Sequence, residues 1–160
     1  MKILLVEDDA ALLWFLAKEL EARGYEVLQT DTGDGGLYFY KKDGPFEFVL
    51  SDYSFIPGTK IKDGVQLVTA IHEINPLQRM AMMTAEPKKA RGKLPNALRD
   101  LPVLRKPFNL EQLLRVAGAR PAALILTHSR VIRCATAVSF ARIVLKSGTT
   151  TKRNRTGRAT

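Results

Sequence analysis

The sequence has one cysteine, two histidines and no long apolar run among its 160 residues. Cys134 cannot form a disulfide within the chain, and His72 and His128 stand too far apart to suggest a metal cluster. No stretch approaches the roughly 18 uninterrupted apolar residues of a transmembrane helix, and no secretory leader pattern opens the chain. These absences predict a protein without a membrane span, in a reducing and cytoplasmic setting.

Acidic residues are missing from the last 40 residues. Residues 121–160 contain eight Lys and Arg and no Asp or Glu, so this segment accounts for +8 of the net charge of +9. Residues 1–120 contain 17 basic and 16 acidic residues and are nearly neutral. The split, with Pro121 at the boundary, predicts a globular domain over residues 1–120 and a basic extension over residues 121–160.

The basic extension is predicted to be partly helical and then disordered. Apolar residues recur at helical spacing between residues 129 and 146, whereas residues 148–160 have little to bury. One interpretation is contact with nucleic acid or an acidic membrane surface; the other, which we favour, is a solvated extension without a dedicated partner. The extension contains no helix-turn-helix or zinc-finger spacing, so sequence-specific DNA binding is not expected.

Residues 1–120 alternate short apolar runs with amphipathic segments. The runs are residues 3–6, 27–30, 48–51, 80–83 and 103–105. Such runs are typical of parallel strands buried on both faces, and the alternation predicts an α/β fold, a doubly wound five-stranded parallel sheet with five helices on its faces. Gly92 and Pro95 interrupt the fourth helix, expected near residues 86–98, which should be short or irregular.

Chemically active side chains follow the strands of this predicted sheet. They are Glu7, Asp8 and Asp9 after the first run, Asp52 after the third, Thr84 after the fourth and Lys106 after the fifth. Because ligands of open parallel sheets bind outside the carboxyl ends of the strands, these side chains should converge on one edge. Asp9 is expected to cap the helix that begins near Ala10 rather than to bind a ligand.

Clustered carboxylates favour a bound cation. Each pair repels by roughly a kcal/mol even with partial solvent screening, and oxygen ligands completed by water suit Mg²⁺. A carboxylate beside that metal can accept a phosphoryl group, while the metal and Lys106 offset charge and Thr84 donates a hydrogen bond. The pattern therefore predicts phosphoryl transfer to Asp52. A metal-dependent hydrolase is less favoured, because no histidine lies near this edge in the sequence pattern.

Four separated motifs carry a family resemblance. "KILLVEDD" at the first strand, "FVLSD" at the third, "MMTA" at the fourth and "LRKPF" after the fifth together resemble the receiver domain of two-component response regulators. The resemblance covers about residues 1–120 and implies a flavodoxin-like (βα)5 fold with strand order 2-1-3-4-5. It also implies a phosphorelay switch, phosphorylated by a sensor histidine kinase or a phosphotransfer protein, and not an enzyme that turns over a substrate.

The resemblance implies a magnesium site built on the acidic residues. Asp8 would bind Mg²⁺ directly and Glu7 through water. Asp52 and the backbone carbonyl of Ser54 would complete the protein ligands. Asp52 would also be the phosphoacceptor, so that the metal and the nucleophile share one carboxylate.

Two further residues would act on the phosphoryl group itself. By the resemblance, Thr84 would turn its hydroxyl toward the group and Lys106 would pair with it, with a cis peptide bond before Pro107. Val103 occupies the family's switch position, which is usually aromatic. The usual coupling between threonine and an aromatic ring therefore lacks its aromatic half in this chain.

The remaining expectations concern output. The loop after Asp52 is longer than usual in the family and could alter donor choice or the lifetime of the phosphorylated state. The expected target is a protein, contacted in a phosphorylation-dependent way by a monomer or weak dimer. The alternative is a DNA-binding transcriptional regulator whose output is the basic extension. Trp14 is expected to pack in the core or along a helix face.

Overall fold

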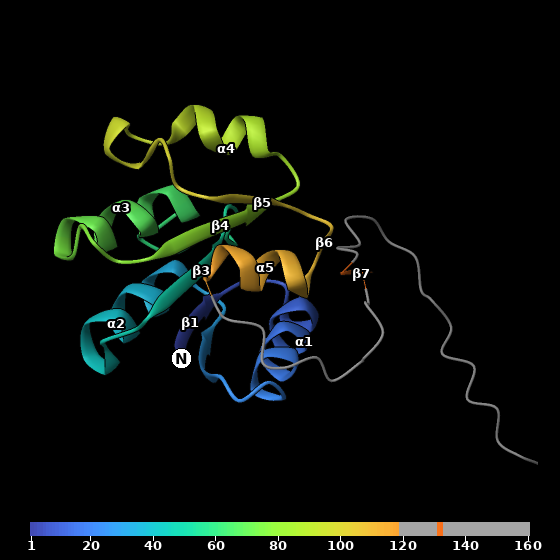
Figure 1. Ribbon diagram of the computed structural model, residues 1–160. Helices are drawn as coiled ribbons and strands as arrows, with labels where there is room; N and C mark the ends of the chain where they lie inside the picture. Colours follow the sequence, from blue (N-terminus) through green and yellow to red (C-terminus); the bar gives the residue numbers. More distant parts are fainter. Residues whose placement is uncertain (119–130, 133–160) are drawn as a thin grey trace, which may run out of the picture.

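The structure, a computed structural model, describes residues 1–118 and 131–132 (Figure 1). Its main sheet has five parallel strands in the order β2-β1-β3-β4-β5. The strands are β1 (Lys2–Val6), β2 (Glu26–Thr30), β3 (Phe48–Asp52), β4 (Met80–Thr84) and β5 (Val103–Arg105). The predicted doubly wound, flavodoxin-like fold is confirmed, and each predicted apolar run lies within one of these strands.

Helices cover both faces of this sheet (Figure 1). They are α1 (Ala10–Glu21), α2 (Gly33–Asp43), α3 (Gly64–Ile74), α4 (Pro87–Lys93), the 3-10 helix η1 (Asn96–Leu98) and α5 (Leu110–Val116). α1 and α5 share one buried cluster, which includes Leu16 and Leu113. α2, α3 and α4 share the other, which includes Tyr40, Leu67 and Ala90. In the part of the chain described, no helix is long and apolar enough to cross a membrane.

β3 is buried along its whole length because it lies between β1 and β4 and has helices on both sides. Phe48 and Leu50 belong to the cluster under α1 and α5, whereas Val49 belongs to the cluster under α2, α3 and α4. Burial on both faces explains why the run is apolar throughout rather than alternating. Asp52 therefore ends a fixed, fully enclosed strand.

Two predicted helical segments contain glycine or proline, and only the fourth helix is shortened in the structure. α2 continues through Gly35, and its first turn is capped by the hydroxyl of Thr32, which accepts a hydrogen bond from the Gly35 amide at 3.1 Å. The fourth helical segment is short, as predicted. α4 stops before Leu94, which adopts the extended backbone expected of a residue that precedes Pro95, and η1 follows.

The basic extension lies outside the described residues, apart from Val131 and Ile132. These two residues form β7, which pairs antiparallel with β6 (Phe108–Asn109). The helix predicted over residues 129–146 is therefore wrong at these two positions, where both residues are β-branched, a type that favours extended backbone. The rest of that helix and the disorder predicted after residue 148 concern residues outside the described part.

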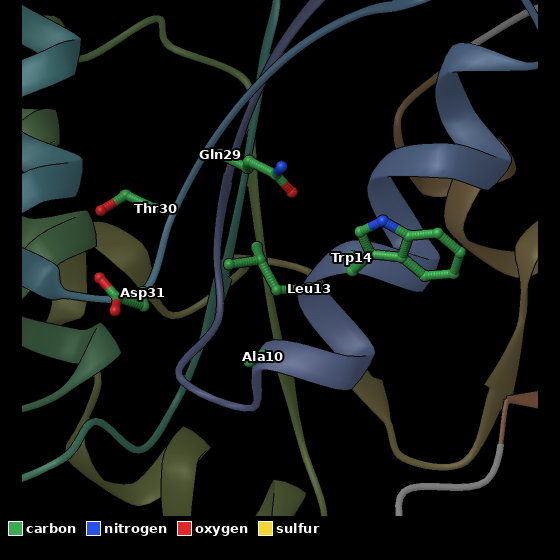
Figure 2. Close-up of a pocket in the computed structure, with 6 residues that line it drawn as sticks. All are labelled: Ala10, Leu13, Trp14, Gln29, Thr30 and Asp31. Carbon is green, nitrogen blue, oxygen red and sulfur yellow. The ribbon is translucent and has the colours of Figure 1, made fainter.

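Trp14 does not pack as predicted, because its side chain is 61% exposed on α1. It borders a hollow of about 350 Å³ beside the carboxyl end of β2 (Figure 2). The residues of α1 that are buried against the sheet are Leu12, Leu16, Ala17 and Leu20. Helical geometry places Trp14 on the opposite side of α1 from Leu12 and Leu16, so the core side of this helix is already filled.

We expect Leu50→Ala to lower the free energy of unfolding by about 2–5 kcal/mol, because Leu50 is fully buried and the truncation leaves a cavity. Leu77→Ala is the matched control: Leu77 is 89% exposed, and the same truncation there should change stability by less than about 0.5 kcal/mol. Urea unfolding followed by circular dichroism measures both. Losses of similar size would contradict the central place of β3 in the core.

Candidate functional site

Three acidic side chains meet at the carboxyl ends of β1 and β3. Glu7, Asp8 and Asp52 each offer a carboxylate oxygen within 4.8 Å of the others. They meet because β1 and β3 are neighbours in register, with Val6 paired to Ser51, so that the residues just beyond this pair lie side by side. Glu7 and Asp52 are buried and Asp8 is half-buried. These three residues are called the acidic cluster below.

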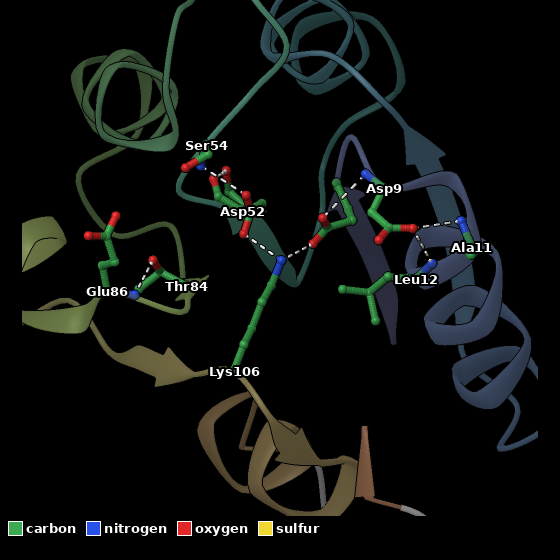
Figure 3. A network of polar contacts seen from close by, with 10 residues as sticks. Asp9, Ala11, Leu12, Asp52, Ser54, Thr84, Glu86 and Lys106 are labelled. Carbon is green, nitrogen blue, oxygen red and sulfur yellow. Dashed lines mark hydrogen bonds and ion pairs between the residues drawn. The ribbon is translucent and has the colours of Figure 1, made fainter. Parts of the chain in front are cut away.

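Lys106 reaches the acidic cluster from the end of β5 (Figure 3). Its Nζ lies 2.7 Å from Glu7 Oε2 and 2.7 Å from Asp52 Oδ1. All three residues are more than nine-tenths buried. Charges taken out of water lose hydration and are tolerated when they are closely paired, so loss of Lys106 would leave two buried carboxylates uncompensated.

The acidic cluster shifts the pKa values of its members. Burial, and then the Asp52 carboxylate, raise the pKa of Glu7 to about 7 against the opposing effect of Lys106. Burial, and then Asp52, also raise the pKa of Asp8. Burial lowers the pKa of Lys106, but the Asp52 and Glu7 carboxylates outweigh burial, and the net effect is a raised pKa. The lysine stays charged, yet one ammonium faces three carboxyl groups, an imbalance that favours a bound cation.

Backbone contacts fix Asp52 at the end of β3. The amide of Ser54 donates to Asp52 Oδ2 at 2.9 Å, and the hydroxyl of Ser51 donates to the Asp52 carbonyl at 2.7 Å. Gly64, the first residue of α3, approaches the same carbonyl so closely that an added Cβ would collide with it. The amide of Gly64 also donates to the carbonyl of Tyr53 at 2.8 Å. The missing side chain of Gly64 therefore lets α3 begin directly against the end of β3.

Two of the predicted polar residues bond to nearby backbone. Thr84 is buried at the end of β4, and its Oγ1 accepts a hydrogen bond from the Glu86 amide at 3.0 Å (Figure 3). Asp9 caps α1, because its Oδ1 accepts from two amides of the first turn at 3.0 and 3.1 Å. The capping role predicted for Asp9 is confirmed, and Thr84 stands beside the acidic cluster without a hydrogen bond to it.

The long loop after β3 is held in place by a side chain that the sequence pattern did not single out. Asp34, in the first turn of α2, accepts hydrogen bonds from the amides of Lys60 at 2.9 Å and Ile61 at 3.0 Å. Ser54 and Asp63 close the loop with an antiparallel bridge. The extra length of the loop was the sequence feature that indicated such a contact, because the backbone amides of a long loop need acceptors from elsewhere in the fold.

The remaining predicted residues are Ser54, Val103 and Pro107. Ser54 follows Asp52 by two positions and is anchored to it by its amide. Val103 is half-buried in β5 and packs against the apolar cluster under α2, α3 and α4. The peptide bond between Lys106 and Pro107 is cis. The position that usually holds the family's switch aromatic is thus filled by a small apolar side chain.

The donor set of the acidic cluster fits a hard divalent cation. Its three carboxylates supply only oxygen, which Mg²⁺ prefers, and Mg²⁺ sites commonly use one or two carboxylates and complete the shell with water and phosphate oxygens. Within residues 1–118, this is the one group of acidic, histidine or cysteine side chains close enough together to hold a metal. The partial exposure of Asp8 leaves the cluster open to solvent on one side.

The fold and the site together define a class of protein. A doubly wound α/β sheet that gathers an acidic cluster and a buried lysine at the carboxyl ends of its strands is the architecture of a phosphoacceptor signalling domain. The chain belongs to the response regulator receiver domain family, whose sequence model matches residues 3–117. It is therefore a receiver domain of two-component signalling, as the four motifs predicted.

Individual relatives agree with this assignment. The response regulator receiver protein CpdR of Brucella abortus is 36% identical over 112 residues, which cover 70% of this chain and 89% of CpdR. The receiver domain of the hybrid histidine kinase CckA is 25% identical with a TM-score of 0.57, over 72% of this chain and 94% of that one. A response regulator receiver protein from Sinorhizobium medicae is 25% identical with a TM-score of 0.62, over 74% and 91%.

We expect the stability of the metal-free protein to fall as pH rises from about 4.5 to about 7. The pKa of Glu7 is higher in the folded protein than its ordinary value of 4.5, so the native state binds more protons than the unfolded state in this window and loses that advantage as Glu7 ionises. Glu7→Gln should flatten this slope without abolishing it, because the raised pKa of Asp8 acts in the same direction. Urea unfolding across pH in the presence of a chelator measures the slope; identical slopes for the two proteins would contradict the shift.

Proposed function

We propose that Asp52 accepts a phosphoryl group from a phosphohistidine, with Mg²⁺ bound at the acidic cluster. The observation that carries the proposal is the placement of Asp52, which lies within 4.8 Å of two other carboxylates and 2.7 Å from the Lys106 ammonium. A carboxylate with an adjacent metal site and a fixed cation has what phosphoryl transfer needs, because the transferred group brings negative charge that the protein must offset.

In the proposed reaction, an oxygen of the Asp52 carboxylate forms a bond to phosphorus. The bond from phosphorus to the imidazole nitrogen of the donor breaks, and its electron pair stays on that nitrogen. Lys106 offsets charge on the phosphoryl oxygens, and the amide of Ser54 orients the carboxylate. Later attack by water returns the carboxylate and inorganic phosphate, so the chain undergoes a reversible modification and does not turn over a substrate.

The proposed metal ligands are Asp8 directly, Glu7 through water, Asp52, and the backbone carbonyl of Ser54. When bound, Mg²⁺ supplies positive charge next to the phosphoryl oxygens. Thr84 is the proposed hydroxyl donor to one of these oxygens. Because Thr84 Oγ1 acts as the acceptor in its bond with the Glu86 amide, its own hydrogen remains available for donation.

The proposed setting is a cytoplasmic phosphorelay. The donor would be a sensor histidine kinase or a phosphotransfer protein, and the similar CckA receiver is itself part of a hybrid histidine kinase. Residues 1–120 form the proposed receiver unit, which would act as a monomer or weak dimer and contact a target protein when phosphorylated. Residues 121–160 are proposed to be a solvated basic extension. No observation on the described residues favours the DNA-binding alternative.

Incubation with a small acyl phosphate and Mg²⁺ should add one phosphoryl group to the protein, and Asp52→Asn should add none. The substitution keeps the shape of the side chain but removes the nucleophilic carboxylate. Asp100→Asn is the matched control, since Asp100 is exposed and lies outside the acidic cluster. Intact mass spectrometry measures the gain. Uptake by Asp52→Asn equal to that of the wild type would refute Asp52 as the acceptor.

Mg²⁺ should raise the thermal unfolding midpoint of the wild type, because a ligand that binds the folded state stabilises it. Asp8→Asn should weaken Mg²⁺ binding at least about tenfold, a loss of about 1.4 kcal/mol. Asp9→Asn is the control, since the neighbouring residue caps α1 and asparagine caps equally well. Thermal shift titrations compare the three proteins, and an equal loss in both variants would remove the metal role of Asp8.

A further inference from the structure

Tyr53, the residue directly after Asp52, is buried with an unpaired hydroxyl. Its side chain is part of the core at 4% exposure. Among the residues that the structure describes, its Oη is the one buried side-chain polar atom without a hydrogen-bond partner. Buried polar groups nearly always have a partner, because an unpaired one loses its hydration without compensation. The phosphoacceptor chemistry makes no use of this hydroxyl, so its presence needs another explanation.

The backbone of Tyr53 is tied to two elements that border the acidic cluster. Its amide donates to the carbonyl of Met83 in β4 at 3.0 Å, and its carbonyl accepts from the amide of Gly64 in α3 at 2.8 Å. Tyr53 is also joined to Asp52 by the peptide bond. Any displacement of Asp52 therefore moves the backbone of Tyr53 and strains its bonds to β4 and α3.

The side chain of Tyr53 lies on the side of the sheet that α4 covers. It belongs to the same buried cluster as Ala90 of α4. The Nζ of Lys93, also in α4, lies 5.4 Å from the centre of the ring and 3.7 Å from a carboxylate oxygen of Asp63, the residue that caps α3. No hydrogen bond joins the Nζ of Lys93 to the Tyr53 hydroxyl.

The switch position of this chain holds Val103 and not an aromatic residue, so a switch aromatic would have to be another residue. Val103 packs against the same cluster as Tyr53, but it has no polar atom and no ring that could exchange one partner for another. Tyr53 has both, and it stands between the proposed phosphoacceptor and α4. The unpaired hydroxyl raises the free energy of the resting conformation. A second conformation in which the hydroxyl has a partner therefore differs less in free energy from the resting one.

We propose that Tyr53 is a positioning residue that transmits the state of Asp52 to α4. The inference rests on the proposed phosphorylation of Asp52. Modification of Asp52 shifts the adjoining backbone, the Tyr53 hydroxyl gains a partner that it lacks in the resting arrangement, and α4, packed against the ring, moves with it. The phosphorylation of Asp52 is thus coupled to α4 through the adjacent residue Tyr53 and not through position 103.

The test compares Tyr53→Phe with the wild type, since this substitution keeps the ring and removes only the hydroxyl. Both proteins are phosphorylated with acyl phosphate and Mg²⁺, and amide hydrogen exchange of residues 87–93 is measured before and after. Tyr53→Phe should take up the phosphoryl group to the wild-type extent, while its change in exchange upon phosphorylation is at least halved. Its unphosphorylated form should unfold at the same or a higher temperature, because no bonded hydroxyl is lost.

Tyr40→Phe is the matched control in the same apolar cluster. It removes a hydroxyl that donates to Gln78 Oε1 at 2.9 Å, so it should lower the unfolding temperature and leave the response of α4 intact. If the wild type takes up no phosphoryl group, the phosphorylation of Asp52 fails and the inference fails with it. If both proteins are phosphorylated and residues 87–93 respond equally, or do not respond in the wild type, only the role of Tyr53 is overturned.

Discussion

The pairing of Lys106 with Glu7 and Asp52 is the interaction on which the site depends. Lys106 and Glu7 are 99 residues apart in sequence, and both bonds to the ammonium measure 2.7 Å. They can form only when β1, β3, β4 and β5 lie side by side in the right order. The two buried carboxylates in turn need the ammonium, because a buried charge without a partner is costly. The arrangement of the strands therefore positions the site residues, and the ion pairs in turn connect the ends of β1, β3 and β5.

The end of β3 is the second constraint, since both α3 and the loop after β3 meet it. Gly64 lets α3 begin against the Asp52 carbonyl, and the amide of Ser54 holds the carboxylate oxygen. Asp34 of α2 fixes the far part of the loop that follows. The Asp52 carboxylate is thus placed by backbone contacts on a buried strand, which gives a more constant geometry than a mobile loop would.

The strands and the strand-end residues could be predicted because both have local signatures. A buried parallel strand is a short apolar run, and the rule that ligands bind at the carboxyl ends then selects the polar residues that follow each run. The individual bonds between residues distant in sequence could not be predicted. Asp34 bonds an amide 26 residues away, Lys106 serves two carboxylates at once, and Val131 pairs with a strand formed by residues 108–109. The exposure of Trp14 likewise depends on which side of α1 meets the sheet.

The charge balance of the pocket indicates which segments would respond to the proposed phosphorylation of Asp52. When all three carboxyl groups are ionised, Lys106 leaves two negative charges in excess, and phosphorylation replaces the single charge of Asp52 with nearly two. Lys106 cannot offset the addition alone, because Glu7 already shares it. The rest of the compensation must come from a bound cation and from donors such as the Thr84 hydroxyl and nearby amides, which belong to the connections that lead from β3 to α3 and from β4 to α4. Under the proposed phosphorylation, a local change of charge at Asp52 would therefore act on these two connections, and both of them adjoin α4.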